Sequence, residues 1–549
     1  MKNRFSSKFS KALSLTSFFA SFGFMAMAQQ GAAPVTANSL VILLFSCVMI
    51  LVVFLAAVLG DKIIKLAAGK FNADKDSTPG LLPTFKELFI GEEETLADGS
   101  KKKVNSLSQG FDIKLSGKAA KLLKKYDAKT YAVKPTDFVG LQPIPKILVK
   151  EGQAVKAGEK LFFDRGFEGV FFTSPVSGTV KEIKRAAKRA IAEIIIEADG
   201  KNESLSFPKA NPLTLSKETV LAQLADSGAL TLLTERPFGV VPSLSSNPKS
   251  IHISAFDTAP LAVDYNFVFK NIPAADFQAG LDALSRIAPV HLNLDANKTK
   301  STTLLNANGV NKNYFNGVHP TGNVGVQIHH VDPIAKGEIV WTIKAEDVAT
   351  IGKLFTAGVY EPKRYLALVG SVLNENYYVE SLLGANVASL IEGNLNNDNV
   401  RVVSGNVLSG KQIAADGFVS YFDNLVSVIE EGNFQEMFGW MVPQYARPSI
   451  SPTIPWSMFP STVFDANTNM HGEKRAFVVT GQYEEVLPMD IYPQQLIKAI
   501  IKNDFEEMEG LGIYEVLEED LALCEFVCTS KQPLQSILRD GLDYIRSQN

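Results

Sequence analysis

The residues best suited to chemistry lie in one stretch near the middle of the chain, residues 317–333. It contains three glycines and three of the chain's six histidines: Gly317, Gly322, Gly325, His319, His329 and His330. Imidazoles could bind a metal, but neighbouring histidines in an extended segment point to opposite faces, and no cysteine or paired carboxylate lies at ligand spacing. The glycines could surround a phosphate, but they match neither common glycine-rich phosphate pattern. We therefore favour a rigid, turn-rich loop whose histidines bond to backbone carbonyls or to a partner protein, and whose glycines permit unusual backbone angles and close approach.

A second group of candidates lies in predicted strands before this loop. Asp257 follows residues 251–256, whose alternating pattern predicts a strand, and ligands of open α/β sheets gather at the carboxyl ends of strands. An aspartate in this position more often caps the following turn. His252 and His291 lie within predicted strands, and we interpret them as structural histidines whose hydrogen bonds are satisfied.

The cysteines argue against a redox cluster on this chain. There are three, Cys47, Cys524 and Cys528. An iron–sulfur cubane normally needs four thiolates, and Cys47 lies in an apolar segment far from the other two along the chain. We predict that no cluster binds and that the cysteines are free, as in a reducing cytoplasm.

Length and composition restrict the class of protein. The chain has 549 residues, of which 46% are hydrophobic and 20% charged, so it can form several hydrophobic cores. Its net charge is −4, and it has no basic stripe with interleaved aromatic residues, so we predict no nucleic-acid partner. Proteins or small molecules are the expected partners.

The N-terminal sixty residues differ from the rest. Residues 1–28 have a basic start, an apolar middle and small residues before a possible cleavage site, as in a signal peptide. Residues 29–39 form a short polar stub, expected in the periplasm. Residues 40–60 are apolar and long enough to span a bilayer, so they predict one transmembrane helix.

The charges after this span predict its orientation. Lys62, Lys65 and Lys70 follow it and no charged residue lies just before it, so the positive-inside rule places the main body in the cytoplasm. Residues 61–110 are rich in charged residues, Ser, Pro and Gly, which predicts a tether with one short helix or strand. We interpret the opposite charge runs at 92–94 and 101–103 as solvated.

The next domain, residues 111–205, is predicted to be a small β fold. Short alternating strands separated by Gly152, Gly158 and Gly178 resemble the two quasi-symmetric halves of a biotinyl/lipoyl barrel-sandwich domain. A carrier domain needs a lysine at the tip between these halves, but the tip offers Arg165, which cannot be acylated in that way. The fold is therefore expected without the carrier function.

Residues 206–549 predict three further domains. Residues 206–360 alternate helices and strands, which favours an α/β layer with a largely parallel sheet. The pattern of residues 361–435 predicts a strand, a helix and a strand. Residues 436–549 are mixed and then helical, with apolar residues at helical spacing in 496–501, 518–527 and 534–545.

Residues 110–549 resemble one known family in motif order. The matching segments are the loop 317–333 with the strand and helix start after it, residues 131–140, 236–238, 256–261, 365–405 and 425–440. They resemble the NqrA family, which supplies one subunit of the sodium-translocating NADH:quinone oxidoreductase (Na+-NQR), a bacterial membrane pump. The α/β domain is then expected to be Rossmann-like and related to the flavin subunit of complex I. The domain at 361–435 similarly resembles the β-grasp (SLBB-like) domain that follows the flavin domain in that protein.

The resemblance implies a subunit that binds no cofactor of its own. NADH and quinone are the substrates of the complex, electron transfer is coupled to sodium export, and FMN, FAD, riboflavin and iron–sulfur centres are expected in partner subunits. The chain would lie on the cytoplasmic face of the inner membrane against subunits B to F of the complex, chiefly the B subunit. Ordinary members of the family lack the N-terminal membrane anchor predicted here.

The resemblance and the residues together give the candidate contacts to partners or quinone. They are Arg236, Phe238, Asp257, His319, His329 and His330. No catalytic or metal-ligating residue is predicted. An alternative function is a membrane-anchored binding or scaffold protein outside any redox complex, and copurification with flavin-bearing partners would distinguish the two.

Overall fold

The computed structural model describes most of the chain after the N-terminal region. The described residues are Met49, 93–95 and 100–548, except 168, 440–445, 452–453, 455–458 and 460. The predicted signal-like segment, the stub and, apart from Met49, the predicted span at 40–60 lie outside this part. Within it, no helix is both long enough and apolar enough to cross a membrane.

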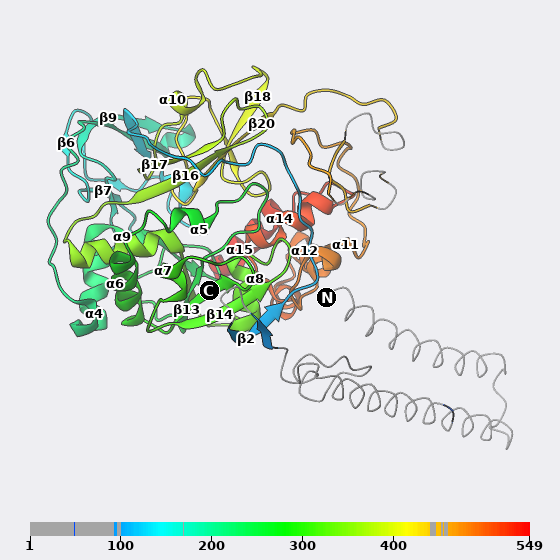
Figure 1. Cartoon of the computed structure of the whole chain (residues 1–549), viewed down its shortest axis with the longest axis horizontal. Helices are drawn as coiled ribbons and strands as arrows, with labels where there is room; N and C mark the ends of the chain where they lie inside the picture. The colour runs from blue at the N-terminus through cyan, green and yellow to red at the C-terminus, as the bar shows by residue number, and fades with distance from the viewer. Residues whose placement is uncertain are drawn as a thin grey trace, which may run out of the picture. The chain divides into compact units, whose positions relative to one another are not determined.

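A seven-stranded sheet forms the α/β domain (Figure 1). Its strands in spatial order are β1 (Glu93–Thr95), β2 (Lys101–Ser106), β14 (Asn311–Asn316), β13 (Val290–Asp295), β12 (Ser250–Ser254), β15 (Val340–Lys344) and β11 (Leu233–Arg236). The strands from β2 to β15 are parallel, and β1 and β11 add antiparallel edges. The predicted, largely parallel sheet is therefore confirmed.

The C-terminal end of the expected tether belongs to this sheet. Strand β2 pairs in parallel with β14, and β1 folds back antiparallel on β2. In this register Glu93 lies opposite Lys103, and Glu94 lies opposite Lys102. Lys102 and Lys103 are exposed, as expected of solvated charges, and the backbone around them forms a strand of the sheet.

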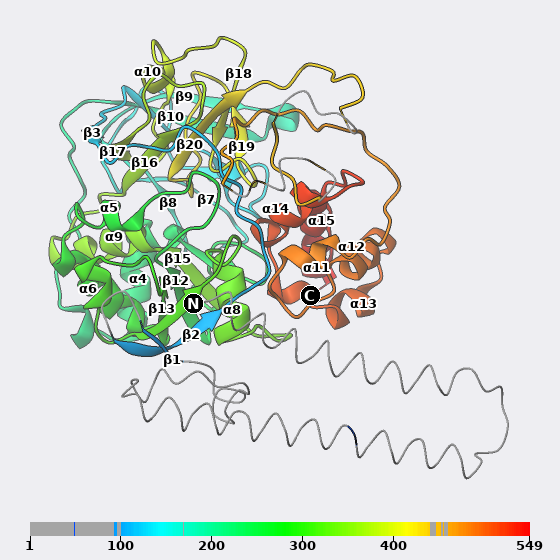
Figure 2. The same cartoon turned by 45° about the vertical axis from the view of Figure 1, so that its right-hand side comes forward.

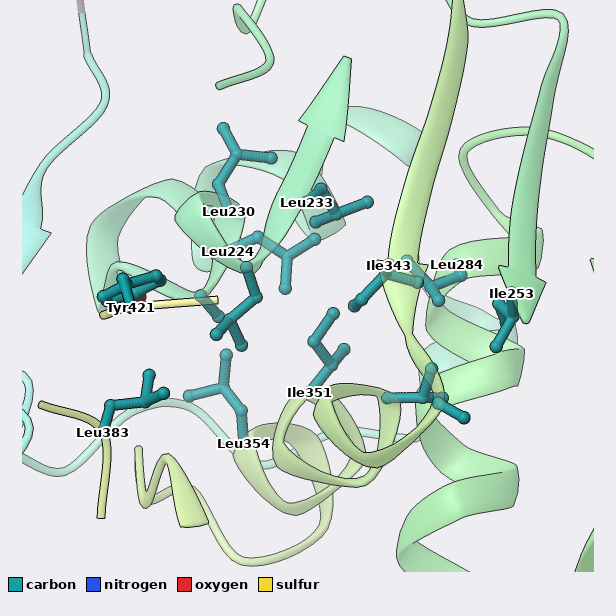
Figure 3. Close-up of a cluster of buried hydrophobic side chains, with 14 of the residues drawn as sticks. Leu224, Leu230, Leu233, Ile253, Leu284, Ile343, Ile351, Leu354, Leu383 and Tyr421 are labelled. Carbon is teal, nitrogen blue, oxygen red and sulfur yellow. The ribbon is translucent and has the colours of Figure 1, made fainter. Parts of the chain in front are cut away.

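Helices cover the sheet on both faces. The helices α6 (Ala274–Ser285) and α9 (Ala345–Thr356) pack together so closely that a Cβ on Gly280 would lie 1.9 Å from the Val348 carbonyl oxygen. Figure 3 shows the core beneath them, which takes side chains from several strands and helices of this domain, and Leu383 and Tyr421 from beyond it. Each buried Leu or Ile side chain contributes about 1.5–3 kcal/mol to folding. Because Leu383 and Tyr421 come from the domain that follows the α/β domain, this core stabilises the two domains jointly.

Local signals in the sequence account for the helix before β11. Helix α4 (Lys217–Ser227) begins at Ser216, whose hydroxyl accepts a hydrogen bond from the Thr219 N–H, and ends at Gly228 in the left-handed region. Both ends follow from residue type, because Ser is a preferred N-cap residue and Gly readily adopts the left-handed region. The smaller helices of the domain are α5 (Tyr265–Val268) and α7 (Thr302–Leu305).

Only the first half of the stretch 317–333 is the turn-rich loop that we expected. Its second half forms helix α8 (Val324–Val331), which lies near β12 in Figure 2 and carries both His329 and His330 in its last turn. The described glycines Gly317, Gly322 and Gly325 all lie outside the left-handed φ region, so the expectation of unusual backbone angles was wrong. Close approach is what requires these glycines.

The barrel-sandwich domain consists of two small sheets. One holds β4 (Thr130–Val133), β10 (Ile191–Ala198), β9 (Gly178–Arg185) and β6 (Ala154–Val155). The other holds β5 (Lys146–Ile147), β7 (Lys160–Phe163) and β8 (Phe172–Thr173). Phe162 and Phe172 stack in its core with ring centroids 4.6 Å apart. This confirms the predicted barrel-sandwich architecture.

A six-stranded sheet forms the next domain. Its order is β19 (Lys411–Ile413), β18 (Val400–Ser404), β20 (Leu425–Glu430), β16 (Lys363–Val369), β17 (Tyr377–Leu382) and β3 (Leu123–Lys125), with the short helix α10 (Ala388–Ile391). Strand β3 lies within the range predicted for the barrel domain, residues 111–205, but pairs with β17 of this sheet, so that boundary was set too early. Two segments distant in sequence thereby share one sheet.

The C-terminal domain is helical, as predicted. It contains α11 (Gln482–Val486), α12 (Pro493–Lys502), α13 (Phe505–Gly510), α14 (Glu518–Val527) and α15 (Leu534–Gln548), shown in orange and red in Figure 2. The described cysteines, Cys524 and Cys528, are free and buried in its core. Burial raises the pKa of the Cys524 thiol, which therefore stays protonated.

Candidate functional site

The candidate site is a cavity of about 350 Å³ at the carboxyl ends of the central strands. Strand β12 leads through α6 to its neighbour β13 and on to β14, after which the chain crosses through α8 to β15 on the other side of β12. The strand order reverses between β12 and β15. Open α/β sheets bind ligands at this switch point, and the cavity is lined there by Ser254, Asp257, Gly322 and Lys344.

Two other domains complete the cavity. The β-grasp domain contributes Asn406, Asp423 and Asn424, and the C-terminal domain contributes residues 517–519 and Arg539. The site therefore exists only where these domains are folded against the α/β domain. Its chemistry depends on contacts that are distant in sequence.

A buried ion pair closes one side of the cavity. Arg236, the last residue of β11, is 1% exposed, and its Nη2 lies 2.6 Å from Glu519 Oε1 while Nη1 lies 3.1 Å from Asp520 Oδ2. Burial opposes the charge on Arg236, but both carboxylates outweigh it and raise the pKa of Arg236. Asp520 also accepts the Leu517 N–H at the start of α14, at 3.0 Å. The acidic first turn of α14 is thus held against the α/β domain.

Glycines allow this close contact between the domains. A Cβ on Gly325, in the first turn of α8, would lie 2.1 Å from Asp520 Oδ2 and 2.5 Å from Arg236 Nη1. A Cβ on Gly322 would lie 2.6 Å from the Thr258 nitrogen. The N-terminal end of a helix favours negative charge, and here the Asp520 carboxylate lies against it.

Asp257 combines the two roles weighed from the sequence. Its Oδ1 accepts the Ala259 N–H at 2.8 Å, which is the predicted turn cap, and its side chain also faces the cavity. Although more than a third of Asp257 is accessible, the surrounding protein raises the pKa of its carboxyl group through desolvation. Desolvation likewise raises the pKa of Glu519, and the Lys344 ammonium opposes both shifts.

Lys344 is the charged group of the cavity without a direct partner. It ends β15 and lies beside the cavity, and among the described residues its ammonium makes no ion pair or hydrogen bond. A free ammonium between two carboxylates of raised pKa can donate hydrogen bonds to a bound molecule. Sequence reasoning missed this residue because nothing in its neighbourhood along the chain marks it.

His319 lies in the wall of the cavity and is neutral. Its ring is buried, and its Nδ1 lies 3.2 Å from Thr258 Oγ1, which in turn accepts the Gly322 N–H at 2.9 Å. Burial lowers the pKa of His319 to about 4. The preceding segment is fixed as well, since the His319 N–H donates to Asp112 Oδ1 at 2.9 Å.

His329 and His330 face the C-terminal domain instead of the cavity. The His329 Nε2 accepts the Asp490 N–H at 3.0 Å, so its Nδ1 carries the hydrogen and donates to Glu515 Oε2 at 2.5 Å. The His330 Nε2 donates to the Pro488 carbonyl oxygen at 2.8 Å. Both histidines thus dock a domain of the same chain.

Phe238 also belongs to this interface. Its ring meets Tyr514 edge-on at 6.5 Å, and its carbonyl oxygen accepts a hydrogen bond from Arg539 Nη1 at 2.8 Å. Of the six predicted site residues, the structure brings Arg236, Asp257 and His319 together around the cavity. Phe238 and the two histidines of α8 lie outside its lining.

The prediction of satisfied histidines inside the strands was wrong for His252. Neither ring nitrogen of His252 has a hydrogen-bond partner among the described residues, and Nε2 lies 4.0 Å from Asp332 Oδ2. Its ring stacks on His291 at 4.6 Å with an interplanar angle of 4°. His291 does have the expected hydrogen-bond contact, since its Nδ1 lies 3.2 Å from Asn313 Nδ2. Burial lowers the pKa of both rings, that of His291 to about 4.

A second buried ion network fixes the β-grasp domain. Arg364 at the start of β16 lies 2.8 Å from Glu346 Oε1 and 3.1 Å from Asp347 Oδ1, both in the first turn of α9. All three side chains are 1% exposed. Burial raises the pKa of Asp347 to about 6 despite Arg364. This network was also missed, since its members lie in different predicted domains.

These contacts define what the site can hold. The position beside the first turn of α8, where a helix terminus would bind a phosphate, is occupied by carboxylates of α14, which would repel one. The remaining cavity offers Lys344 and apolar walls that include Phe256, Val324 and Phe422. In the described part, no group of three or more His, Cys, Asp or Glu residues could hold a metal ion.

The fold and site define a class of protein with a barrel-sandwich module, an α/β domain and a β-grasp domain around a switch-point cavity that a helical domain closes. Three family models match in this order: the NqrA N-terminal barrel-sandwich hybrid domain at residues 106–199, the NqrA second alpha/beta domain at 215–360, and the NQRA C-terminal domain at 365–415.

Curated relatives identify the particular family. The A subunit of the Na(+)-translocating NADH-quinone reductase from Haemophilus influenzae (strain PittGG) is 39% identical over 452 residues, which cover 81% of this chain and 99% of that protein. Its counterpart from Neisseria meningitidis serogroup B is 36% identical over 447 residues, 80% of this chain and 99% of that protein. The chain belongs to this family, the NqrA subunits of the Na(+)-translocating NADH-quinone reductase.

Two solved structures that match are much more distant. One, an NAD+-reducing [NiFe]-hydrogenase in the air-oxidized state, is 11% identical over 73% of this chain and 84% of that chain, with a TM-score of 0.32. This likeness is too weak to support a conclusion. The family assignment rests on the family models and the curated relatives.

Proposed function

We propose that this chain is a scaffold subunit on the cytoplasmic face of a membrane respiratory complex, which transfers electrons from NADH to quinone and exports sodium. In this proposal the chain carries no redox centre, and FMN, FAD, riboflavin and the iron–sulfur centres belong to partner subunits. Membership of the NqrA family supports the role in the complex. The anchor at 40–60 and contact with subunits B to F, chiefly the B subunit, complete the proposal.

The closed switch point carries the proposal of a cofactor-free subunit. A flavin nucleotide or dinucleotide at this position needs an anion seat at a helix terminus. Here Glu519 and Asp520 occupy the space beside α8 and pair with Arg236. A phosphate would have to displace the C-terminal domain and break the buried pair of Arg236 with these carboxylates, which leaves Asp520 without its counter-ion. The residues present therefore do not fit a nucleotide phosphate.

The rest of the cavity supports the link to quinone. A quinone head group is a flat ring with two carbonyl acceptors and no charge, and it needs apolar walls and a hydrogen-bond donor. The cavity supplies Phe256 and Phe422 as walls and Lys344 as a donor. We propose that Lys344 donates to a quinone carbonyl oxygen, with Asp257 opposite.

Copurification tests the role in the complex. The full chain is tagged at its C-terminus and isolated from membranes, and flavin absorbance and the quinone reduction rate are measured together. The proposal predicts that flavin and activity accompany the partner subunits, and that the chain expressed alone is colourless. Flavin or iron in stoichiometric amount on the chain alone would contradict it. Isolation without any flavin-bearing partner would favour a scaffold outside a redox complex.

Kinetics of the assembled complex test the quinone site. Lys344→Met removes the proposed donor, and we expect the KM for quinone to rise about tenfold, the value of one hydrogen bond to a charged group, while the KM for NADH is unchanged. Lys336→Met, in the same domain but paired with Glu509 on the surface, is the matched control. Equal quinone KM values for wild type and Lys344→Met would refute the site.

A further inference from the structure

A basic hairpin projects from the barrel-sandwich domain. Strands β9 and β10 pair antiparallel as far as Arg185 and Ile191, and the chain turns between them (Figure 2). The burial alternation of β9 stops after Val180, and the six residues 184–189 are all exposed. Because no face of this end packs on the body, the hairpin end is available to another surface.

The hairpin end carries cations that the rest of the chain does not neutralise. Five basic residues lie within nine positions: Lys181, Lys184, Arg185, Lys188 and Arg189. Lys184 pairs with Glu193 at 3.2 Å, whereas in the described part of the chain the other four have no carboxylate partner. The nearby acids Glu151 and Glu182 leave an excess of positive charge at the end of the hairpin.

The turn itself is unfavourable for its residues. Lys188 has φ 54° and ψ 27°, and Arg189 has φ 64°, while the Ala190 N–H donates to the Ala187 carbonyl oxygen at 3.2 Å. Two consecutive residues with positive φ make a turn of the kind that strongly prefers Asn and Gly. A lysine and an arginine at these positions lower the stability of the fold, so we attribute their presence to their charge.

An exposed apolar residue lies beside the hairpin. The Ile191 N–H donates to the Pro143 carbonyl oxygen at 3.0 Å, which fixes the segment 143–145 against the base of the hairpin. Ile144, between two prolines, is 55% exposed. An apolar side chain next to clustered Lys and Arg residues is the combination that binds anionic lipid surfaces, where the apolar group enters the head-group region.

We propose that this hairpin and Ile144 contact the anionic phospholipid surface of the membrane that holds the complex. The contact goes beyond the proposed scaffold role, and it is separate from the anchor predicted at 40–60. Four cations meet a surface of opposite charge, and the αL turn presents two of them at the tip. An acidic face of a partner protein is the alternative occupant, and the experiment below distinguishes it.

Limited trypsin digestion of the full chain in vesicles tests the contact. The chain is reconstituted in vesicles of phosphatidylcholine alone or with about 30% phosphatidylglycerol, and mass spectrometry follows cleavage within 184–189 in outward-facing molecules. Cleavage at the exposed Lys474 and Arg475 is the internal reference. We expect cleavage of the hairpin to be at least about tenfold slower on anionic vesicles, and about 0.5 M NaCl to remove the difference through screening.

Two variants separate charge from fold. Lys188→Asn with Arg189→Gly suits the αL turn and keeps the hairpin, and Lys188→Glu with Arg189→Glu reverses its charge; both should lose the protection on anionic vesicles. Lys474→Glu with Arg475→Glu, for which cleavage after the exposed Lys270 is the reference, should leave the protection of the hairpin intact. Equal cleavage rates on neutral and anionic vesicles would overturn the proposal. Protection that appears only with partner subunits, whatever the lipid charge, would overturn it in favour of a protein partner.

Discussion

Replacing Arg236 by Met removes the cation that holds the C-terminal domain on the cavity. Asp520 is fully buried beside it, and Glu519 keeps 47% of its side chain accessible. Removing one member of a buried pair typically costs about 3–5 kcal/mol, because the remaining charge has no counter-ion. Asp520 retains one hydrogen bond, from the Leu517 N–H, so we expect the lower end, about 3 kcal/mol.

The loss of stability should be confined to the contact of the C-terminal domain, and this determines the choice of assay. A chain of several domains does not unfold in one step, so a single unfolding midpoint would not report this contact. Native-state hydrogen exchange gives the free energy of opening of α14 amides separately from those of the barrel domain. We expect the Arg236→Met variant to lower it in α14 by about 3 kcal/mol and to leave β9 and β10 unchanged.

A double-mutant cycle gives the result that would refute this reasoning. With Asp520→Asn the uncompensated charge is absent, so Arg236→Met should then cost about 2 kcal/mol less than in the wild type. Lys336→Met is the matched control, because its pair with Glu509 joins the same two domains at the surface, with Lys336 65% exposed, and should contribute about 1 kcal/mol or less. A cost below about 1 kcal/mol for Arg236→Met, or additive effects in the cycle, would show that the ion pair does not hold the domains together.

Three further predictions follow from the same contacts. Gly325→Val should destabilise the domain contact by about 3 kcal/mol or more in hydrogen exchange, because its side chain would enter the buried ion pair, whereas Gly510→Ala, with open space around its Cβ, should be neutral or stabilising. His319 has a folded pKa of about 4, so its contribution to stability is lost as pH falls from about 6.5 to about 4. In His319→Asn the slope of the unfolding free energy against pH in that window should be smaller by up to about 1.4 kcal/mol per pH unit. An unchanged slope would contradict the burial argument. His329→Ala with His330→Ala should increase hydrogen exchange of the Asp490 amide, whose N–H donates to His329 Nε2 in the wild type; unchanged exchange would show that this bond is dispensable.

Much of the fold follows from local signals in the sequence. The alternation in 251–256 and 290–294 reflects strands with one apolar face, and Ser216 and Gly228 mark the ends of α4 through their own hydrogen bond and φ angle. The barrel domain was recognised from its glycine turns. Such signals act within a few residues, so they can be recognised in one segment of the sequence without knowledge of the rest of the fold.

The errors have long-range causes. The glycines and proline of 317–333 suggested a loop, but packing of α8 against the sheet and the C-terminal domain stabilises a helix that local propensity disfavours. The hairpin β1–β2 was missed because highly charged strands gain stability only from the partner strand β14. Likewise, we expected the histidines of 317–333 to contact a partner protein, whereas His329 and His330 contact the C-terminal domain of the same chain.

The candidate site was only partly predictable. Asp257 and His319 were found because strand ends and glycine-rich turns mark positions near ligands. Lys344 ends β15 with no local sign of a ligand site around it, and Glu519 reaches the cavity only through a domain contact, 283 residues beyond Arg236 along the chain. A run of three acids at the start of a helix was the one local sign, and it is also the ordinary composition of a first helical turn.

The most direct test of the closed switch point is a calorimetric titration of the purified full chain with FMN, NADH and ADP. Because the carboxylates of α14 occupy the anion position beside α8, we predict no binding tighter than about 1 mM for any of the three, which corresponds to about −4 kcal/mol. Micromolar binding of FMN or NADH with a stoichiometry of one would contradict the account, because it would place a nucleotide phosphate where Glu519 and Asp520 lie.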